Sequence, residues 1–381
     1  MPTYWHGLLL GPVLLSWIYW IATAIAVALF FARKAHPARE GWRPTVSLIK
    51  PACGLEKDAY ANLASACAQD YPDYEVIYAL QNSRDPILPV LEKIRADHPH
   101  CRVRILIDPA AAGPNGRLCN ILNATREAKG DVLVYSDSDM RLDPGYLGAI
   151  VAPLADPTVG ISCTLYRGQG AVNAWESLEL LSLNAEFVPS MIFATETGAA
   201  LACPGASQAV RRETLEKIGG LAPMADSLIE DLELGRRIVA AGLKLVIGPH
   251  VATTGVDLGG WRAWWRHQVY WDQNTRAANP IGFFFTCLVR GIPLAVLYSF
   301  MMLPHDMFEL ELLLATIALR LGTAASNCLY LGDREGLRAL WLLPLRDLAG
   351  VATWAASFFQ RKIYWKGREF VLSGNRLVES V

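Results

Sequence analysis

A long uncharged stretch near the start of the chain limits the folds open to it. Residues 8–31 contain no Asp, Glu, Lys or Arg and are mostly apolar. About 20 such residues cross a bilayer as a helix, and only helices and closed barrels satisfy their own backbone there. A secretory signal peptide fits less well, because no Lys or Arg precedes the run and its apolar part is too long. We expect a transmembrane helix here, within an N-terminal segment of residues 1–34.

The rest of the apolar content is also unevenly spread. The chain of 381 residues is 52% hydrophobic, with a mean hydropathy of +0.24, and the excess gathers at both ends. Residues 282–303 and 308–331 can each cross a bilayer, despite Arg290 and Arg320. This pattern predicts membrane helices over residues 281–360, separated from the first helix by a water-soluble domain.

Charge and cysteine usage exclude several other classes of protein. A net charge of −1 gives no electrostatic basis for binding nucleic acid. The eight cysteines form no C-x-x-C pair, so neither a zinc site nor a disulfide framework is indicated.

Basic residues predict the orientation in the membrane. Arg33, Lys34, Arg39 and Arg43 directly follow the first apolar run. The positive-inside rule therefore places the central domain in the cytosol, together with the basic tail of residues 361–381.

Residues 337–359 fit this topology only if they do not cross the bilayer. Pro344, Arg346 and Asp347 interrupt an otherwise apolar run, and a complete crossing would put the basic tail outside. We therefore expect a re-entrant or interfacial hairpin, with Arg346 and Asp347 paired or facing a polar cavity.

The central part alternates short apolar runs with helical stretches. Helices are expected over residues 58–68 and 87–97 and from Asn115 onward. The expected strands between them cover residues 46–50, 74–80, 103–107 and 132–135. This alternation predicts an α/β domain with a mostly parallel, Rossmann-like sheet and ligands at the carboxyl ends of the strands. No G-x-G-x-x-G or Walker A pattern is present, which argues against a dinucleotide dehydrogenase or a P-loop enzyme.

Two carboxylates follow the fourth expected strand. Asp137 and Asp139 are separated by Ser138, so both side chains can close on one hard cation. Carboxylate oxygens suit Mg2+ or Mn2+, which usually keep positions open for phosphate oxygens. An ordinary acidic turn would show the same pair, and the spacing alone favours that interpretation.

Further motifs keep a recognisable order along the chain. They are Val46-Ser-Leu-Ile-Lys-Pro51, Gln69-Asp-Tyr-Pro72, Glu75-Val-Ile, Asp85-Pro86 and Asp137-Ser-Asp139. The series resembles a GT-A glycosyltransferase, and more narrowly glycosyltransferase family 21, from about residue 1 to about residue 370. That family contains ceramide glucosyltransferases and bacterial glycosyltransferases of hopanoid biosynthesis. The resemblance implies a GT-A domain, which we place at residues 35–280.

The resemblance also implies roles for individual residues. Asp137 and Asp139 would hold Mg2+ or Mn2+, and Arg117 is a fixed cation suited to phosphate oxygens. A surface arginine beside a capping asparagine is the alternative interpretation of Arg117 and Asn120. Asn82 stands where the family often has an earlier Asp. The implied donor-binding residues are Lys50, Pro51, Asp85, Arg117, Asn120, Asp137 and Gly205.

The segment Ile229-Glu230-Asp231 matches the family's third acidic motif, with Asp231 at the position of the catalytic base. In an inverting mechanism this carboxylate takes the proton of the acceptor hydroxyl. Glu230 is the neighbouring candidate. An acidic helix start, which the helix dipole also favours, is the alternative explanation.

A later aromatic segment departs from the family pattern. Trp271 is retained from the family's Gln/Arg-x-x-Arg-Trp motif, but Tyr270 stands where its Arg is expected. Arg266, His267 or Arg276 could supply the missing cation near the leaving diphosphate, so all five are assigned to the leaving-group and acceptor side. A belt of aromatic side chains at the membrane interface would look the same.

By resemblance, the chain is a membrane-bound inverting hexosyltransferase of glycolipid biosynthesis. It would move glucose or N-acetylglucosamine from a UDP-sugar to a lipid hydroxyl, as ceramide glucosyltransferases of sphingolipid synthesis do. Its place would be a bacterial inner membrane. A bacteriohopane polyol that receives N-acetylglucosamine is the alternative acceptor. Tyr270 favours a third hypothesis, a non-catalytic membrane scaffold, against which the retained Asp85, Asp137, Asp139 and Asp231 argue.

Overall fold

The computed structural model describes residues 3–33, 41–302, 307–360, 362–365 and 368–379. Its chain divides into two compact units, each built from segments far apart in the sequence. The helical unit comprises Met1–Ala32, Gly168–Ala200 and Leu258–Arg361. The sheet unit comprises Arg33–Arg167, Leu201–Asp257 and Lys362–Val381.

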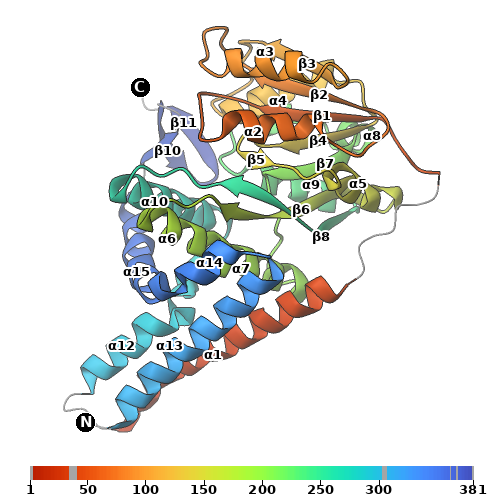
Figure 1. Ribbon diagram of the computed structural model, residues 1–381. Helices are drawn as coiled ribbons and strands as arrows, with labels where there is room; N and C mark the ends of the chain where they lie inside the picture. The colour runs from red at the N-terminus through yellow and green to blue at the C-terminus, as the bar shows by residue number, and fades with distance from the viewer. Residues whose placement is uncertain (1–2, 34–40, 303–306, 361, 366–367, 380–381) are drawn as a thin grey trace. The chain divides into compact units, whose positions relative to one another are not determined.

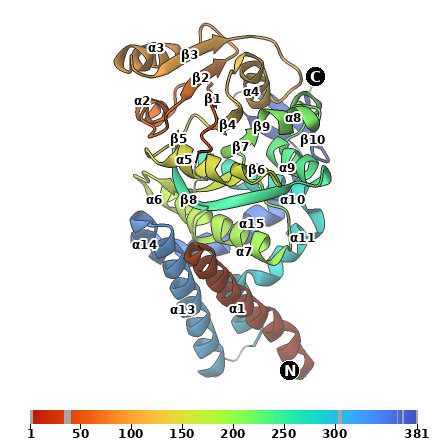
Figure 2. The same cartoon turned by 90° about the vertical axis from the view of Figure 1, so that its right-hand side faces the viewer.

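The sheet unit is built on an eight-stranded sheet with the order β3-β2-β1-β4-β7-β6-β8-β5. The long strands β6 and β8 run side by side in it (Figure 2). The strands are β1 (Val46–Pro51), β2 (Tyr74–Leu80), β3 (Arg102–Ile107), β4 (Val132–Ser136), β5 (Met140–Arg141), β6 (Val159–Gln169), β7 (Ser207–Arg211) and β8 (Lys244–Gly255).

The first four strands confirm the apolar runs read from the sequence. β1 pairs in parallel with β2 and with β4, and β2 with β3. Every residue of β1 and β4 is buried, as expected for parallel strands covered on both faces. The predicted parallel pairing stops at β4, because β7 pairs with β4 and with β6 in the antiparallel direction. The sheet is therefore mixed.

Short helices flank this sheet and begin near the strand ends. Asn115 caps α4, since its Oδ1 accepts a hydrogen bond from the Leu118 backbone N–H at 3.0 Å. The helices of the sheet unit include α2 (Ala59–Ala64), α3 (Leu88–Asp97), α4 (Gly116–Glu127), α5 (Tyr146–Val151), α8 (Arg212–Lys217) and α9 (Glu230–Ala240).

The segment expected to be a basic tail folds as a second, three-stranded sheet. Antiparallel strands β9 (Lys362–Trp365), β10 (Arg368–Ser373) and β11 (Arg376–Glu379) form it. Ile363, Phe370 and Leu377 are buried, one from each strand. The expected tail is thus structured wherever it is described, and residues 366 and 367 lie outside the described residues.

In the helical unit, α1 (Thr3–Ala32) packs against α7, α12 and α13 (Figure 1). Gly7–Ala32 and Met307–Tyr330 are long and apolar enough to cross a membrane, and Pro280–Val289 with Gly291–Met301 forms a pair bent by 55°. The other helices are α6 (Ala174–Ser182), α7 (Val188–Thr197), α10 (Trp261–Ala278), α11 (Pro280–Phe285), α12 (Gly291–Met301), α13 (Met307–Tyr330), α14 (Arg334–Ala339) and α15 (Leu343–Phe359).

This grouping differs from the expected domain boundaries. Residues 168–200 and 258–280 pack with the terminal helices, whereas the sequence placed them in the transferase domain of residues 35–280. Where a hairpin was expected over residues 337–359, α14 is followed by α15, a single helix of 17 residues. Arg346 and Asp347 of α15 are paired, as expected, at 3.2 Å. Lys34 and Arg39 of the predicted orientation signal lie outside the described residues.

Candidate active site

The turn after β4 carries Asp137 and Asp139 and is called the acidic turn below. A buried lysine holds it in place. Lys50 is completely buried in β1, and its Nζ donates to Ser136 Oγ at 3.2 Å, to the Asp137 carbonyl at 2.7 Å and to the Met140 carbonyl at 3.0 Å. Burial lowers the pKa of this ammonium group to about 8. Its three hydrogen bonds go to Ser136 and to two backbone carbonyls of the turn, so Lys50 holds the backbone that carries Asp137. Its donor-binding role stays a prediction.

Arg117 in the first turn of α4 joins three parts of the sheet unit. Its Nε donates to Asp137 Oδ1 at 2.7 Å, and its Nη2 donates to the Gly205 carbonyl at 2.7 Å. Its Nη1 donates to Glu230 Oε1 at 2.5 Å. The guanidinium group thus gathers the acidic turn, the loop before β7 and the start of α9, and it brings together four of the residues singled out in the sequence.

The two neighbouring acids at the start of α9 have different surroundings. Glu230 is occupied by Arg117 and by Asn115, whose Nδ2 donates to Glu230 Oε2 at 2.9 Å. Asp231 accepts the Leu232 backbone N–H at 2.7 Å on Oδ1, and its Oδ2 faces Gly205. Burial, and after it the charge of Glu230, raise the pKa of Asp231 to about 7. A carboxylate with this pKa is matched to accepting a proton near neutral pH, which favours Asp231 over Glu230 as the base.

The contact between Gly205 and Asp231 leaves no room for a side chain. A Cβ added at Gly205 would collide with the Asp231 carboxylate. We expect Gly205→Ala to displace that carboxylate and to lower the turnover number by about 10²-fold, the cost of a misplacement of about 1 Å. Gly148→Ala is the matched control, because a Cβ at this position in α5 meets nothing within 4 Å. Equal rates for Gly205→Ala and the native protein would contradict this placement of the base.

The carboxylates of the acidic turn have the chemistry of a site for a hard cation. Burial, then the charges of Asp137 and Glu56, raise the pKa of Asp139 to about 6, so a cation would relieve unfavourable repulsion. The described hydrogen bonds use one oxygen of each aspartate, from Arg117 on Asp137 and from Thr254 on Asp139. Within the described ranges, no group of three or more His, Cys, Asp or Glu could hold a metal ion. Two carboxylates suffice for Mg2+ where substrate phosphates complete the shell.

The other expected donor residues surround the ends of β1 and β2. Asp85 accepts the Gly54 N–H on both oxygens, at 3.0 and 3.1 Å, so it ties the loops after β2 and β1 together. Asn120 donates to the Ala52 carbonyl at 3.4 Å, and its buried Oδ1 has no hydrogen-bond partner among the described residues. Pro51 is the last, buried residue of β1.

The residues assigned to the leaving-group and acceptor side lie on α10 in the helical unit. His267 Nδ1 is 3.0 Å from Glu179 Oε1, and its Nε2 accepts the Trp271 indole N–H at 3.2 Å. The ring centroids of Tyr270 and Trp271 are 6.5 Å apart. Arg276 lies over the Phe358 ring, with its guanidinium carbon 5.4 Å from the centroid, and Arg266 is exposed.

Sequence reasoning missed the residues that hold the loop before Asp231. Asn375 lies in the turn between β10 and β11, and its Oδ1 accepts the Ile229 N–H at 3.1 Å. The Asn375 carbonyl accepts the Leu228 N–H at 2.8 Å, and the Leu377 N–H donates to the Asp226 carbonyl at 2.8 Å. The alternating apolar residues of the last strands and the Gly-Asn turn were the available signals.

Glu56 and Tyr166 were also missed as neighbours of the acidic turn. Glu56 accepts a hydrogen bond from Ser138 Oγ at 2.8 Å. Burial raises the pKa of the Tyr166 hydroxyl, and the charges of Asp231, Asp137 and Asp139 add to this rise. The Tyr166 hydroxyl is therefore near the acidic turn and Asp231.

An acidic turn at the carboxyl end of β4, faced by a second acid at the start of α9, is the arrangement of a GT-A glycosyltransferase, and the comparison with solved structures gives the same fold. A mannosyltransferase from Pyrobaculum calidifontis, solved with GDP-Man and Mn2+, aligns with a TM-score of 0.52 over 92% of this chain and 96% of that one, at 20% identity. The chain belongs to glycosyl transferase family 21, whose model matches residues 11–378.

Curated relatives share shorter regions with the chain. A ceramide glucosyltransferase from Gibberella zeae is 34% identical over 134 residues, or 32% of this chain and 25% of that protein. A beta-monoglucosyldiacylglycerol synthase from Synechocystis sp. is 26% identical over 277 residues, or 68% of this chain and 56% of that protein. The chain therefore spans between a quarter and somewhat more than half of the length of these two relatives.

Proposed function

We propose that the protein is a membrane-bound inverting glycosyltransferase that moves a hexose from a UDP-sugar to a lipid hydroxyl. The network that joins Arg117, Asp137, Glu230 and Gly205 beside Asp231 carries the proposal, because it fixes a base next to an acidic turn suited to a nucleotide diphosphate. Both curated relatives described above are named for enzymes that add glucose to a lipid, which makes glucose the leading donor sugar.

Asp231 performs the proton transfer in this mechanism. The acceptor oxygen attacks the anomeric carbon of the sugar as Asp231 takes the hydroxyl proton. The bond from the anomeric carbon to the diphosphate breaks on the opposite side, and its electron pair leaves with UDP. Arg117 orients Asp137 and Glu230 through the hydrogen bond that it donates to each, and its charge opposes the rise in the pKa of Asp231.

Asp137 and Asp139 are the residues that would hold Mg2+ or Mn2+. When bound, such an ion neutralises charge on the departing diphosphate. Lys50 supports this role indirectly, because it fixes the backbone of the turn from which Asp137 projects.

The helical unit would keep the enzyme at its lipid substrate. Gly7–Ala32 and Met307–Tyr330 can cross a membrane, and Leu8, Ile18 and Leu29 of α1 are exposed apolar side chains that suit a lipid environment. We place the sheet unit in the cytosol of a bacterium, at its inner membrane, where nucleotide sugars are available. An enzyme held at the membrane does not have to find its lipid substrate by diffusion through solution, and needs only to orient it.

A transfer assay on detergent-purified full-length protein tests the proposal. UDP-glucose and UDP-N-acetylglucosamine are each offered with ceramide, diacylglycerol and a bacteriohopane polyol, in Mg2+, in Mn2+ and in chelator. We expect a glycolipid from at least one pair and its loss in chelator. Binding of UDP-sugar without transfer to any of these lipids would instead support a non-catalytic membrane scaffold.

The pH dependence of the rate tests the assignment of the base. Asp231 must be deprotonated to accept a proton, and its pKa is about 7, so kcat/KM should rise as pH increases through 7 and level off above it. Glu230→Gln removes a charge that raises this pKa, so the rise should move to lower pH. Initial rates between pH 5 and 9 measure both profiles, and a native profile that is flat through neutral pH would contradict the assignment.

A further inference from the structure

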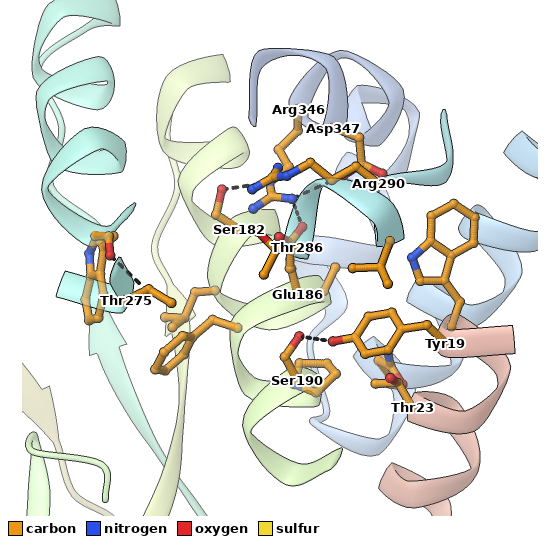
Figure 3. Close-up of a pocket in the computed structure, with 18 of the residues that line it drawn as sticks. Tyr19, Thr23, Ser182, Glu186, Ser190, Thr275, Thr286, Arg290, Arg346 and Asp347 are labelled. Atoms are coloured by element: carbon orange, nitrogen blue, oxygen red, sulfur yellow. Dashed lines mark hydrogen bonds and ion pairs between the residues drawn. The ribbon is translucent and has the colours of Figure 1, made fainter. Parts of the chain in front are cut away.

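The helical unit contains a partly open cavity of about 230 Å³ that is lined by both polar and apolar side chains (Figure 3). Side chains from α1, α6, α7, α10, α13, α15 and residues 283–290 before α12 line it, together with residues of the π-helical turn Leu183–Phe187. Turns of this kind interrupt α-helices frequently at functional sites. None of the residues assigned above to the donor or to the base belongs to this unit.

Most of the charges around the cavity are already paired with one another. Arg320 Nε lies 2.8 Å from Asp347 Oδ2, and Arg346 bridges Asp347 and Glu186. The lining contains three arginines, at positions 290, 320 and 346, and four acids, at positions 179, 186, 272 and 347. The cavity therefore has no excess of positive charge with which to hold a phosphate group.

Three buried polar atoms of the lining have no hydrogen-bond partner within the described part of the chain. They are Thr23 Oγ1 on α1, Asn327 Oδ1 on α13 and Arg290 Nε just before α12. Thr23 is 5% exposed and Asn327 is 3% exposed. Buried polar atoms of folded proteins are nearly always paired, so three from separate segments around one cavity point to a bound group.

The chemistry of these atoms selects among ligands. Asn327 Oδ1 only accepts a hydrogen bond, Arg290 Nε only donates one, and the Thr23 hydroxyl does both. An ionised phosphodiester offers acceptors alone, so it would leave Asn327 Oδ1 unpaired. A hydroxyl or a secondary amide offers a donor and an acceptor, and it can satisfy all three atoms.

The remaining lining is suited to hydrocarbon. Trp20, Leu183, Phe187 and Phe283 contribute apolar surface to the same cavity. An amphipathic molecule with a neutral hydrogen-bonding end matches both parts of the lining.

We propose that this cavity binds the polar end of a lipid whose hydrogen-bonding groups are hydroxyls or amides, in preference to a phospholipid. The further step, that this lipid is the sugar acceptor, rests on the proposed function. Thr23, Asn327 and Arg290 are then specificity-determining residues for the acceptor.

Lipid binding can be measured without any sugar donor. The full-length protein in detergent is incubated with ceramide, diacylglycerol or phosphatidylcholine, whose headgroup has no hydrogen-bond donor, and retained lipid is quantified by native mass spectrometry. We expect retention of a lipid with a free hydroxyl and at least a tenfold weaker retention of phosphatidylcholine. Thr23→Val and Asn327→Leu, which keep side-chain volume but remove hydrogen-bonding atoms, should each weaken retention of the lipid with a free hydroxyl about tenfold.

Thr316→Val is the matched control for these variants. Thr316 is buried on α13, its hydroxyl donates to the Leu312 carbonyl at 2.7 Å, and it does not line the cavity. Its replacement should lower the thermal midpoint without changing lipid retention. The rate of UDP-sugar hydrolysis should be the same in Thr316→Val and in the native protein.

The outcomes separate this proposal from the proposed function. Loss of lipid retention in Thr23→Val and Asn327→Leu supports the cavity site even if no lipid is glycosylated. Retention unchanged in both variants would overturn it, as would a preference for phosphatidylcholine or the absence of any retained lipid. If transfer occurs but lipid retention does not depend on these residues, the proposed function stands and the acceptor binds elsewhere.

Discussion

Replacing Asp231 by asparagine should lower the turnover number for sugar transfer by about 10²- to 10⁴-fold, the usual contribution of a general base. Asparagine has nearly the same shape, so it fits beside Gly205 and its oxygen can still accept the Leu232 N–H. The affinity for UDP-sugar should therefore stay close to that of the native protein. Single-turnover transfer and UDP-sugar binding measure the two quantities.

Replacing two neighbouring acids, Glu230 and Glu233, tests whether the loss of rate is specific to Asp231. Glu233→Gln changes an acid of the same helical turn that pairs with Arg237 at 2.9 Å, and the rate should not change. Glu230→Gln should cost less than Asp231→Asn, because an amide oxygen can still accept from Arg117 and Asn115. A larger loss in Glu230→Gln than in Asp231→Asn would identify Glu230 as the base.

Arg117→Met should both destabilise the sheet unit and alter its chemistry. Breaking a buried charge network by removing one partner typically costs about 3–5 kcal/mol. Here it leaves Asp137, Glu230 and the Gly205 carbonyl without their common donor. Arg117 also opposes the rise in the pKa of Asp231, so its loss should move the pH profile to higher pH. Thermal unfolding and the pH dependence of any residual transfer report the two effects.

Arg126→Met provides the comparison for Arg117→Met. Arg126 is an exposed residue in the last turn of the same helix, and surface replacements usually change stability by less than about 0.5 kcal/mol. Lysine at position 117 should not rescue the network, because a single ammonium group cannot match the planar fork of arginine. An Arg117→Met protein with the native midpoint and pH profile would show that the network is dispensable.

The parallel half of the sheet could be predicted because its signals are local. β1, β2, β3 and β4 are short apolar runs that end in polar or turn residues, and each begins within one residue of its expected position. The antiparallel half depends on pairing between distant segments. β8 pairs with β5, a strand of only two residues. A segment this short has no recognisable alternation of apolar and polar residues in the sequence.

In the candidate site, too, the local motifs could be predicted and the contacts between distant segments could not. The acidic turn and Asp231 are recognisable as motifs, but a motif does not say what a side chain contacts. Lys50 donates to backbone carbonyls 87 and 90 positions further along the chain. Asn375 contacts Ile229 across 146 positions, and it comes from a segment that composition alone assigns to a tail. These contacts exist only in the folded chain.

The hairpin of β10 and β11 sets an order of assembly. A ribosome makes the chain from its N-terminus, so Asn375 emerges after every helix of the helical unit. Until then the backbone N–H groups of Leu228 and Ile229, directly before the acids of α9, lack their partners. The loop that carries the proposed base therefore acquires its final contacts only after every helix of the helical unit has been synthesised.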